Sequence, residues 1–185
     1  MGRWLVRTAL SRHAARAPQD WRFVSNQYGA PAIVDAQQDD AKLRFNLSHT
    51  RGLVAVVVAR EIAVGVDVEH TERRARLAVI ARRFFAPSEV EALLALDEAG
   101  HRDRFFAYWT LKEAYIKARG MGLAIPLGQF FFDVDRRPIT IGFDPRLDDD
   151  PARWHFELSD PYPDHRLAVA VASNGHPVDI QVHWT

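Results

Sequence analysis

Hydrophobic positions alternate or run together in the first third of the chain, and this pattern predicts several strands. Residues 1–17 instead place apolar side chains at helical spacing, which predicts a helix that ends before Pro18. Loops are expected at Gly29, Pro31 and residues 35–40, and strands at Trp21–Ser25, Leu43–Leu47, Leu53–Ala59 and Ile62–Glu69. The run Leu53–Ala59 is apolar throughout, which is typical of a strand buried on both faces.

Helical spacing dominates the middle of the chain, and strand patterns return after it. Helices are expected at Thr71–Phe85, from Pro87 to about Asp97, and most strongly at Arg104–Arg119, before Gly120 and Gly122. Further strands are expected at Phe130–Val134, Trp154–Leu158, Leu167–Ala172 and Val178–His183, with no element in Pro138–Ala152. Helices clustered between groups of strands predict an α+β fold.

Composition limits the classes of partner without naming one. Lys plus Arg and Asp plus Glu both number 24, so the net charge is zero and gives no argument for nucleic acid or a membrane surface. The chain has no cysteine, which excludes disulfides, thiolate metal sites and cysteine nucleophiles. No apolar run is long enough to span a bilayer, and the basic start has no secretory signal pattern, so a cytoplasmic protein is expected.

Two carboxylates lie on one face of the expected strand Ile62–Glu69. Its isoleucine and valines share the face that can enter the core, whereas Gly65, Asp67 and Glu69 share the other, with the two carboxylates roughly 7 Å apart at Cα. Gly65 is expected to keep this face open to a ligand. Like charges so close repel unless a cation or proton intervenes, and oxygen ligands favour a hard cation such as Mg²⁺. Taken alone, the pattern also fits a solvated strand face.

A third carboxylate interrupts the apolar stripe of the longest expected helix. One line along that helix, at spacings of three, four and three, contains Phe106, Trp109, Glu113 and Ile116. A carboxylate on a core stripe is costly unless it is paired or bound to a metal, although Glu113 with Lys117 also fits a surface ion pair. Three carboxylates that hold Mg²⁺, with Lys112 and Lys117 on phosphate oxygens, would suit phosphoryl-group chemistry.

Ser48 and His49 follow each other in the segment before the valine-rich strand. On an extended chain adjacent side chains point to opposite faces, so this serine and histidine cannot form a nucleophile–base pair with each other. Each can still donate a hydrogen bond to a phosphate, and a polar strand end or turn is the alternative interpretation.

Five segments of the chain match known motifs in a fixed order. They read Tyr28-Gly-Ala-Pro31, Phe45-Asn-Leu-Ser-His49, Gly65-Val-Asp-Val-Glu69, Arg83-Phe-Phe-Ala-Pro-Ser-Glu89 and Trp109-Thr-Leu-Lys-Glu-Ala-Tyr-Ile-Lys117. The set resembles the motifs of the 4′-phosphopantetheinyl transferase family of the surfactin type, from near residue 1 to the C-terminus. The combination of Gly-x-Asp-x-Glu with Trp-x-x-Lys-Glu-Ala is highly specific.

The resemblance implies a fold of two similar α+β halves related by a pseudo-twofold axis, with coenzyme A between them. The N-terminal half is expected at residues 1–60, and the C-terminal half, which carries the metal site, at residues 61–185. One departure from the family is that its members carry several tens of residues before the position of Met1, so the N-terminal half is expected to be incomplete. A second departure is Ala30, which stands where the family motif usually has a lysine.

The resemblance also implies roles for individual residues. Asp67, Glu69 and Glu113 match the Mg²⁺ ligands, and Ser48, His49, Lys112 and Lys117 match the residues that contact coenzyme A phosphates. Catalytic roles fall to Asp67, Lys117 and Glu113, the last as the base for the carrier serine. The implied enzyme is a Mg²⁺-dependent 4′-phosphopantetheinyl transferase (a holo-acyl-carrier-protein synthase), whose products are holo-carrier protein and adenosine 3′,5′-bisphosphate.

The implied partners are coenzyme A and an acyl or peptidyl carrier protein, with no nucleic acid or membrane, and the implied state is a monomer. A basic cluster is expected to face the acidic carrier: Arg73, Arg74, Arg76, Arg82 and Arg83. Fatty-acid, polyketide and nonribosomal-peptide carriers remain open, as does Mn²⁺ in place of Mg²⁺. Two other functions remain: a Mg²⁺-dependent coenzyme A or nucleotide hydrolase, and a shortened module that binds coenzyme A or carrier protein without turnover.

Overall fold

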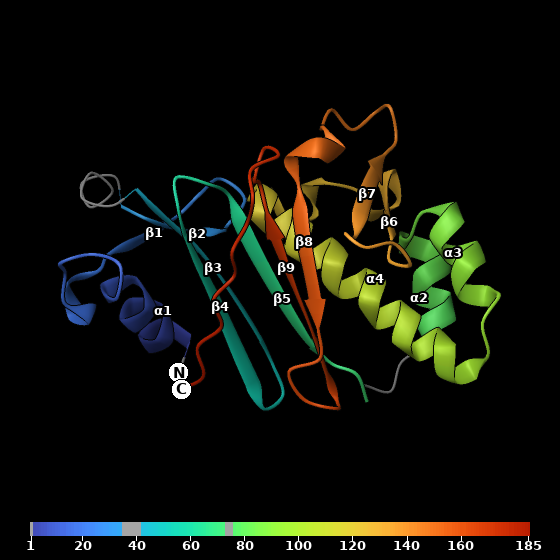
Figure 1. The fold of residues 1–185 in the computed structure, drawn as a ribbon, viewed down its shortest axis with the longest axis horizontal. Helices are drawn as coiled ribbons and strands as arrows, with labels where there is room; N and C mark the ends of the chain where they lie inside the picture. Colours follow the sequence, from blue (N-terminus) through green and yellow to red (C-terminus); the bar gives the residue numbers. More distant parts are fainter. Residues whose placement is uncertain (1, 35–41, 73–75) are drawn as a thin grey trace.

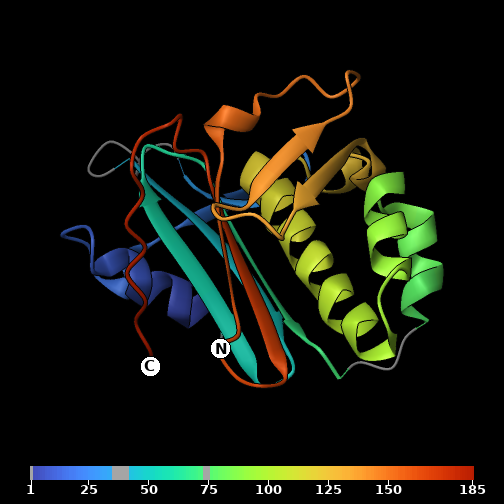
Figure 2. The same cartoon turned by 45° about the vertical axis from the view of Figure 1, so that its right-hand side comes forward.

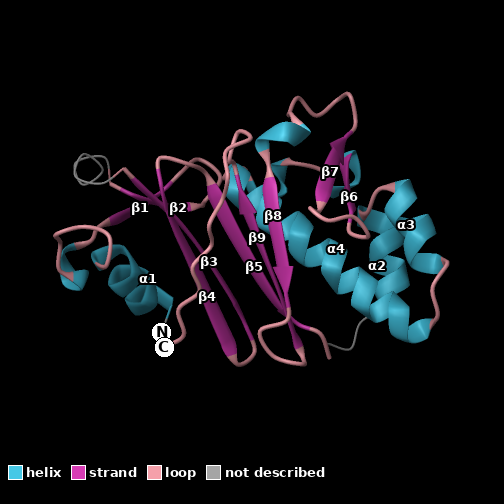
Figure 3. Cartoon of the chain, in the orientation of Figure 1, coloured by secondary structure: helices cyan, strands magenta, loops and turns pink. Residues whose placement is uncertain are grey.

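The computed structural model describes residues 2–34, 42–72 and 76–185, and it has an α+β fold as expected (Figures 1 and 3). Its helices are α1 (Gly2–Ser11), α2 (Leu77–Phe84), α3 (Pro87–Leu94) and α4 (Glu98–Arg119). Its strands are β1 (Phe23–Ser25), β2 (Pro31–Ile33), β3 (Leu43–Thr50), β4 (Leu53–Arg60), β5 (Val64–His70), β6 (Phe130–Asp133), β7 (Thr140–Phe143), β8 (His155–Ser159) and β9 (His165–Val171). The expected loop at residues 35–40, with Arg73 and Arg74, lies outside the described residues.

Within the described residues, the strands form four small antiparallel sheets. The largest has the order β5-β9-β8, with Val64 opposite Val171 and His70 opposite His165, and the other sheets pair β1 with β2, β3 with β4, and β6 with β7. The alternation predicted for β5 is confirmed on its apolar face, since Val64, Val66 and Val68 are all buried.

Helix α4 packs across β5 and β9, and α2 and α3 lie on its far side (Figure 2). The helix begins six residues before the expected start because Asp97 caps it, accepting the Gly100 N–H at 2.8 Å. It ends at Gly120, whose φ of 64° continues the chain in the left-handed conformation that glycine adopts without strain. Within the described residues, no helix is long and apolar enough to cross a membrane.

Side chains, rather than a backbone ladder, connect β3 to β5. Backbone N–H groups of β5 donate to side-chain oxygens of β3 in three pairs, each at 3.2 Å: Val66 to Asn46, Val68 to Ser48, and His70 to Thr50. Polar side chains at every second position of β3 therefore bridge the two sheets, and the two strands are separated by the length of one side chain. The chain passes between these sheets near residue 60, but the division into halves at residues 1–60 and 61–185 and their pseudo-twofold relation stay predictions.

Three local predictions differ from the structure. Strand β4 is half-buried along most of its length rather than fully buried, because one face packs only partly against the cluster of α1 and the other only partly against the valines of β5 and β9. Residues 178–183 form no strand; Val178 and Ile180 instead pack as extended chain against the apolar face of β5 and β9. The unpredicted strands β2 and β7 are too short, at three and four residues, to show a period.

Candidate active site

Gly65 determines how closely α4 approaches β5. A Cβ atom added to this glycine would lie 2.1 Å from the Ala114 carbonyl oxygen and 2.5 Å from the Ala118 backbone nitrogen. The expectation that Gly65 keeps the strand face open to a ligand is therefore wrong, because the backbone of the helix occupies that space. Close approach of α4 instead brings its polar side chains against the carboxylates that follow Gly65 on the strand.

Asp67, Ser48 and Lys117 form a buried junction of three elements. The Lys117 Nζ donates to Asp67 Oδ1 at 2.6 Å and to Ser48 Oγ at 2.9 Å, and Ser48 Oγ donates to Asp67 Oδ1 at 2.8 Å. Asp67 and Ser48 are only 4% and 5% exposed, whereas the Lys117 side chain keeps 27% of its surface accessible. Strand β3, strand β5 and helix α4 thus meet at one charged point.

Glu69 is held at the next outward position of β5 by an indole. The Trp109 Nε1 donates to Glu69 Oε1 at 3.1 Å, and the Trp109 ring stacks on Phe105 with centroids 5.8 Å apart. The sequence pattern gave Trp109 only an apolar role on the helix stripe. The one available signal was its placement four residues before Glu113, which puts both side chains on the same side of the helix.

Glu113 completes a group of three acidic side chains. Burial, together with the charges of Asp67 and Glu69, raises the pKa of Glu113 to about 7, and the charge of Lys117 opposes this shift. These influences require the three carboxylates to lie within electrostatic reach of one another. A glutamate with this pKa holds its proton at mildly acidic pH and releases it near neutrality, which suits a general base.

The three carboxylates have the donor chemistry that suits a hard cation, although they do not have the geometry of a complete metal site. Among the described residues, no group of three or more His, Asp or Glu side chains has the geometry of a metal site. However, Asp67 Oδ2 is buried without a hydrogen-bond partner, and the neighbouring carboxylates repel one another. An unsatisfied carboxylate oxygen beside two further acids is the donor set that Mg²⁺ prefers, and Lys117 supplies the positive charge in this structure.

His49 lies apart from the junction. Residues alternate along β3, so Ser48 faces β5 and is buried, whereas His49 faces the opposite side and is exposed. The two side chains therefore do not meet, as the sequence predicts. As an exposed side chain, His49 is accessible to a ligand on that face.

Lys112 is not brought to this site, in contrast to the expectation of a phosphate contact. Its side chain is fully buried on the other side of α4, where Nζ donates to Glu89 Oε2, the Leu127 carbonyl and the Phe130 carbonyl at 2.8, 2.8 and 2.6 Å. Burial lowers the pKa of Lys112 and raises that of Glu89, and their mutual attraction opposes both shifts. All three ammonium donors are used, so none remains for a phosphate.

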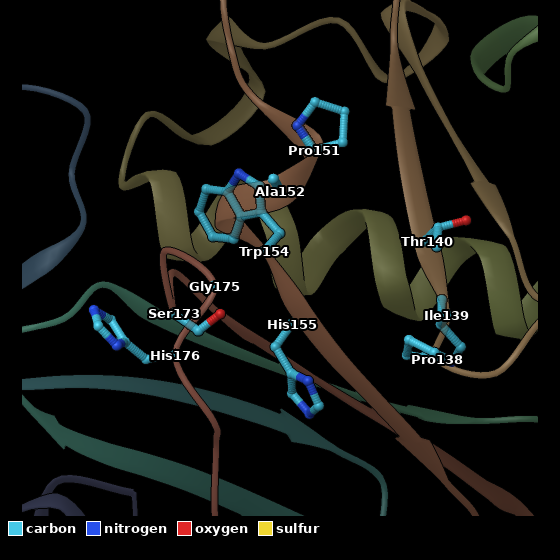
Figure 4. Close-up of a pocket in the computed structure, with 10 residues that line it drawn as sticks. All are labelled: Pro138, Ile139, Thr140, Pro151, Ala152, Trp154, His155, Ser173, Gly175 and His176. Carbon is cyan, nitrogen blue, oxygen red and sulfur yellow. The ribbon is translucent and has the colours of Figure 1, made fainter.

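A cavity of about 380 Å³ lies away from these residues (Figure 4). Its wall includes Pro138, Trp154, His155, Ser173 and His176, from the segment before β7, the entry into β8 and the segment after β9. No residue of the carboxylate group lines it, so the cavity does not belong to the candidate site.

Buried carboxylates and a lysine that meet at one junction of an α+β fold are suited to phosphoryl-group chemistry. Residues 63–172 match the family model of the 4′-phosphopantetheinyl transferase superfamily. This match covers more than half of the chain, which therefore belongs to that superfamily.

Curated relatives extend the match to nearly the whole chain. The 4′-phosphopantetheinyl transferase Sfp of Bacillus subtilis is 32% identical over 181 residues, which cover 97% of this chain and 76% of Sfp. The transferase HetI of Nostoc is 36% identical over 123 residues, which cover 66% of this chain and 52% of HetI. Both relatives are named as 4′-phosphopantetheinyl transferases, which supports the same transferase activity for this chain.

Solved structures of holo-acyl-carrier-protein synthases are also similar in part. The holo-[acyl-carrier-protein] synthase of Thermotoga maritima is 25% identical, with a TM-score of 0.48 over 60% of this chain and 62% of that chain. A likeness of this extent supports no detail of the site.

Proposed function

We propose that this chain transfers the 4′-phosphopantetheine group of coenzyme A to a serine of an acyl or peptidyl carrier protein, using Mg²⁺. The observation that carries the proposal is the junction of Asp67, Ser48 and Lys117, next to Glu69 and Glu113. No simpler structural role explains why three acids gather where α4 presses against β5, because burying like charges together costs stability.

Asp67, Glu69 and Glu113 are the residues that would hold Mg²⁺ in this proposal. When bound, the cation neutralises the carboxylates and the charge that develops on the pyrophosphate oxygens. Asp67 offers its unsatisfied Oδ2, and Trp109 fixes the orientation of Glu69 through the indole N–H.

Lys117 and Glu113 carry the chemical step in the proposed mechanism. The carrier serine oxygen forms a bond to the phosphorus that bears the pantetheine, and the bond from this phosphorus to the bridging pyrophosphate oxygen breaks. Glu113 takes the serine proton, while Lys117 stabilises negative charge on the phosphoryl oxygens. The leaving group is adenosine 3′,5′-bisphosphate.

Ser48 and His49 are proposed to bind coenzyme A from the two faces of β3. Ser48 Oγ donates to Asp67 and accepts from Lys117, so in this proposal its hydroxyl turns from Asp67 to the phosphate that Lys117 binds. His49 is exposed and can donate to a phosphate farther along the cofactor. Lys112 is left out of this set because its ammonium group is already satisfied.

The described part of the basic cluster supplies a docking surface for an acidic carrier protein. Arg76, Arg82 and Arg83 are exposed at α2, and Val79 and Phe84 expose 59% and 40% of their surface beside them. Exposed apolar side chains ringed by arginines favour a partner with acidic and apolar groups together. We expect the protein to act as a monomer in the cytoplasm.

Mass spectrometry of an apo-carrier protein incubated with this chain, coenzyme A and Mg²⁺ tests the proposal. A gain of one phosphopantetheine group is expected, and Asp67→Ala should abolish it while leaving the fold intact. Asp133→Ala, at a partly exposed aspartate of β6, is the matched control and should transfer normally. Unchanged transfer by Asp67→Ala would refute the metal assignment.

Two other outcomes separate the alternative functions. Release of adenosine bisphosphate without carrier protein indicates a coenzyme A hydrolase. Calorimetric binding of coenzyme A with no transfer under any carrier or metal condition indicates a binding module.

A further inference from the structure

The ion pair between Glu89 of α3 and Lys112 of α4 is the most deeply buried in the described part of the chain. The two side chains expose 1% and 0% of their surface, and Oε2 and Nζ are 2.8 Å apart. Charges in such a position are costly, and an apolar pair of similar volume often gives equal or greater stability. A buried pair therefore needs an explanation other than stability.

Glu89 connects three elements through its carboxylate. Besides Lys112, it accepts the Ala86 N–H at 3.1 Å, which caps the start of α3, and the Phe132 N–H of β6 at 3.0 Å. Each carboxylate oxygen is used, and each bond comes from a different segment. The position of this carboxylate is thus fixed by the backbone around it.

Lys112 is fixed with equal completeness. Its three ammonium protons point to Glu89 and to the carbonyls of Leu127 and Phe130, and Nζ lies 4.3 Å from the centroid of the Phe130 ring. Hydrogen bonds are directional, so three bonds to rigid acceptors define one position for the ammonium group.

Lys112 and Glu113 are adjacent, so their side chains leave α4 about 100° apart. Fixing Lys112 against α3 and β6 therefore fixes the direction in which Glu113 leaves the helix toward β5. Lys117 lies on the β5 side, one turn after Glu113, and depends on the same helix position to reach Asp67. The Glu89–Lys112 ion pair and the acidic site are on different sides of one rigid helix.

We infer that Glu89 and Lys112 are positioning residues, which set the rotation of α4 so that Glu113 and Lys117 meet Asp67 and Glu69. This inference rests on the proposed function for its catalytic consequence. It assigns to Lys112 an indirect role, through helix position, in place of a contact with coenzyme A.

Mn²⁺ binding, measured from the electron paramagnetic resonance of free Mn²⁺, reads the acidic site without requiring turnover. The double variant Glu89→Gln/Lys112→Met has no buried charge and keeps the side-chain volumes, so it should stay folded by circular dichroism. We expect Mn²⁺ affinity and kcat each to fall about tenfold or more, with the KM for coenzyme A changed little. Near-normal Mn²⁺ affinity and kcat in the folded double variant would overturn the inference.

Glu89→Asp provides a second variant that retains both charges. It withdraws the carboxylate by one methylene, so Lys112 must shift toward α3, and Mn²⁺ affinity is again expected to fall. A stable Glu89→Asp protein with normal Mn²⁺ affinity would also overturn the inference. Arg104→Met removes a different α4 cation, paired with the exposed Asp135, and should leave both measurements unchanged; equal losses there would show that the effect is not specific to the pair.

The remaining outcomes distinguish this inference from its rivals. A raised KM for coenzyme A in Lys112→Met, with normal Mn²⁺ binding, would restore a phosphate contact and reject the positioning role. Wild-type protein that binds Mn²⁺ but transfers nothing would refute the proposed function, and the positioning role would still be judged by Mn²⁺ affinity. Wild-type protein that does not bind Mn²⁺ would reject both.

Discussion

The indole N–H of Trp109 donates to the Glu69 carboxylate at 3.1 Å, across the contact between α4 and β5. This bond joins a residue at the apolar edge of the helix to one of the three acids of the site. Hydrogen bonds of this kind orient metal ligands and are commonly worth a factor of about 10–100 in metal affinity or activity.

Trp109→Phe is therefore expected to reduce Mg²⁺ affinity and transfer by about tenfold while preserving the fold. The phenyl ring can still stack on Phe105, so only the hydrogen bond is removed. Calorimetric titration with Mg²⁺ and a transfer assay measure the change. Trp184→Phe, at a side chain that is 62% exposed, is the control and should behave as wild type; equal loss in both variants would contradict a role for the bond.

Gly65→Ala should separate α4 from β5. The new Cβ would lie 2.1 Å from the Ala114 carbonyl oxygen, so helix or strand must move, at a cost of about 1–3 kcal/mol. The thermal midpoint is expected to fall by about 5 °C or more, with loss of transfer. Gly128→Ala is the control because its Cβ would meet nothing closer than 3.6 Å. A Gly65→Ala protein as stable and active as the control would disprove the close approach.

The raised pKa of Glu113 predicts opposite effects of pH on the metal-free and metal-bound protein. Because the folded pKa is about 7 and the ordinary value is 4.5, the folded state holds a proton that the unfolded state has released. The free energy of unfolding without metal should therefore fall as pH rises from about 4.5 to 7 and then level off. Mg²⁺ affinity should rise across pH 6–8, because binding requires Glu113 to lose that proton.

Melting curves at pH 5 and pH 8, with and without Mg²⁺, check both directions. Glu113→Gln has no carboxyl proton to release, so the changes in unfolding free energy and in Mg²⁺ affinity that come from Glu113 should be absent in this variant. Identical pH profiles for wild type and Glu113→Gln would mean that Glu113 titrates at its ordinary pKa.

His49→Ala tests the proposed coenzyme A contact on the outer face of β3. Since His49 is exposed and Ser48 carries the contacts to β5, the substitution should leave stability within about 0.5 kcal/mol of wild type. The KM for coenzyme A should rise several-fold with kcat nearly unchanged. A loss confined to kcat would move His49 into the chemical step.

Asp149 is expected to be essential for stability although it lies in a segment with no predicted element. Its buried Oδ2 accepts Tyr115 Oη at 2.7 Å and Trp154 Nε1 at 3.1 Å, and also accepts from Arg119. Asp149→Asn leaves the Arg119 charge unpaired and should cost about 2–4 kcal/mol in a denaturation experiment. The neighbouring exposed Asp148→Asn should cost almost nothing, and equal stabilities of the two variants would contradict the assignment.

Local patterns predicted the residues that share a face. Asp67 and Glu69 are two positions apart, and Glu113 and Lys117 are four apart, so strand and helix geometry alone place each pair together. The segment Pro138–Ala152 has no pattern that predicts an element, because its strand β7 is only four residues long. The contacts of Asp149 could not be predicted either, because its partners Tyr115 and Trp154 belong to α4 and to the entry into β8.

The amino-acid sequence by itself determined the α+β class, the family and the acidic residues, because these depend on short-range periodicity and on the order of motifs. Only the tertiary structure decided that Gly65 admits a helix and not a ligand, and that Lys112 turns away from the phosphates to Glu89. Both outcomes depend on how closely α4 approaches the elements around it. That distance results from the packing of side chains far apart in the chain, which no local pattern records.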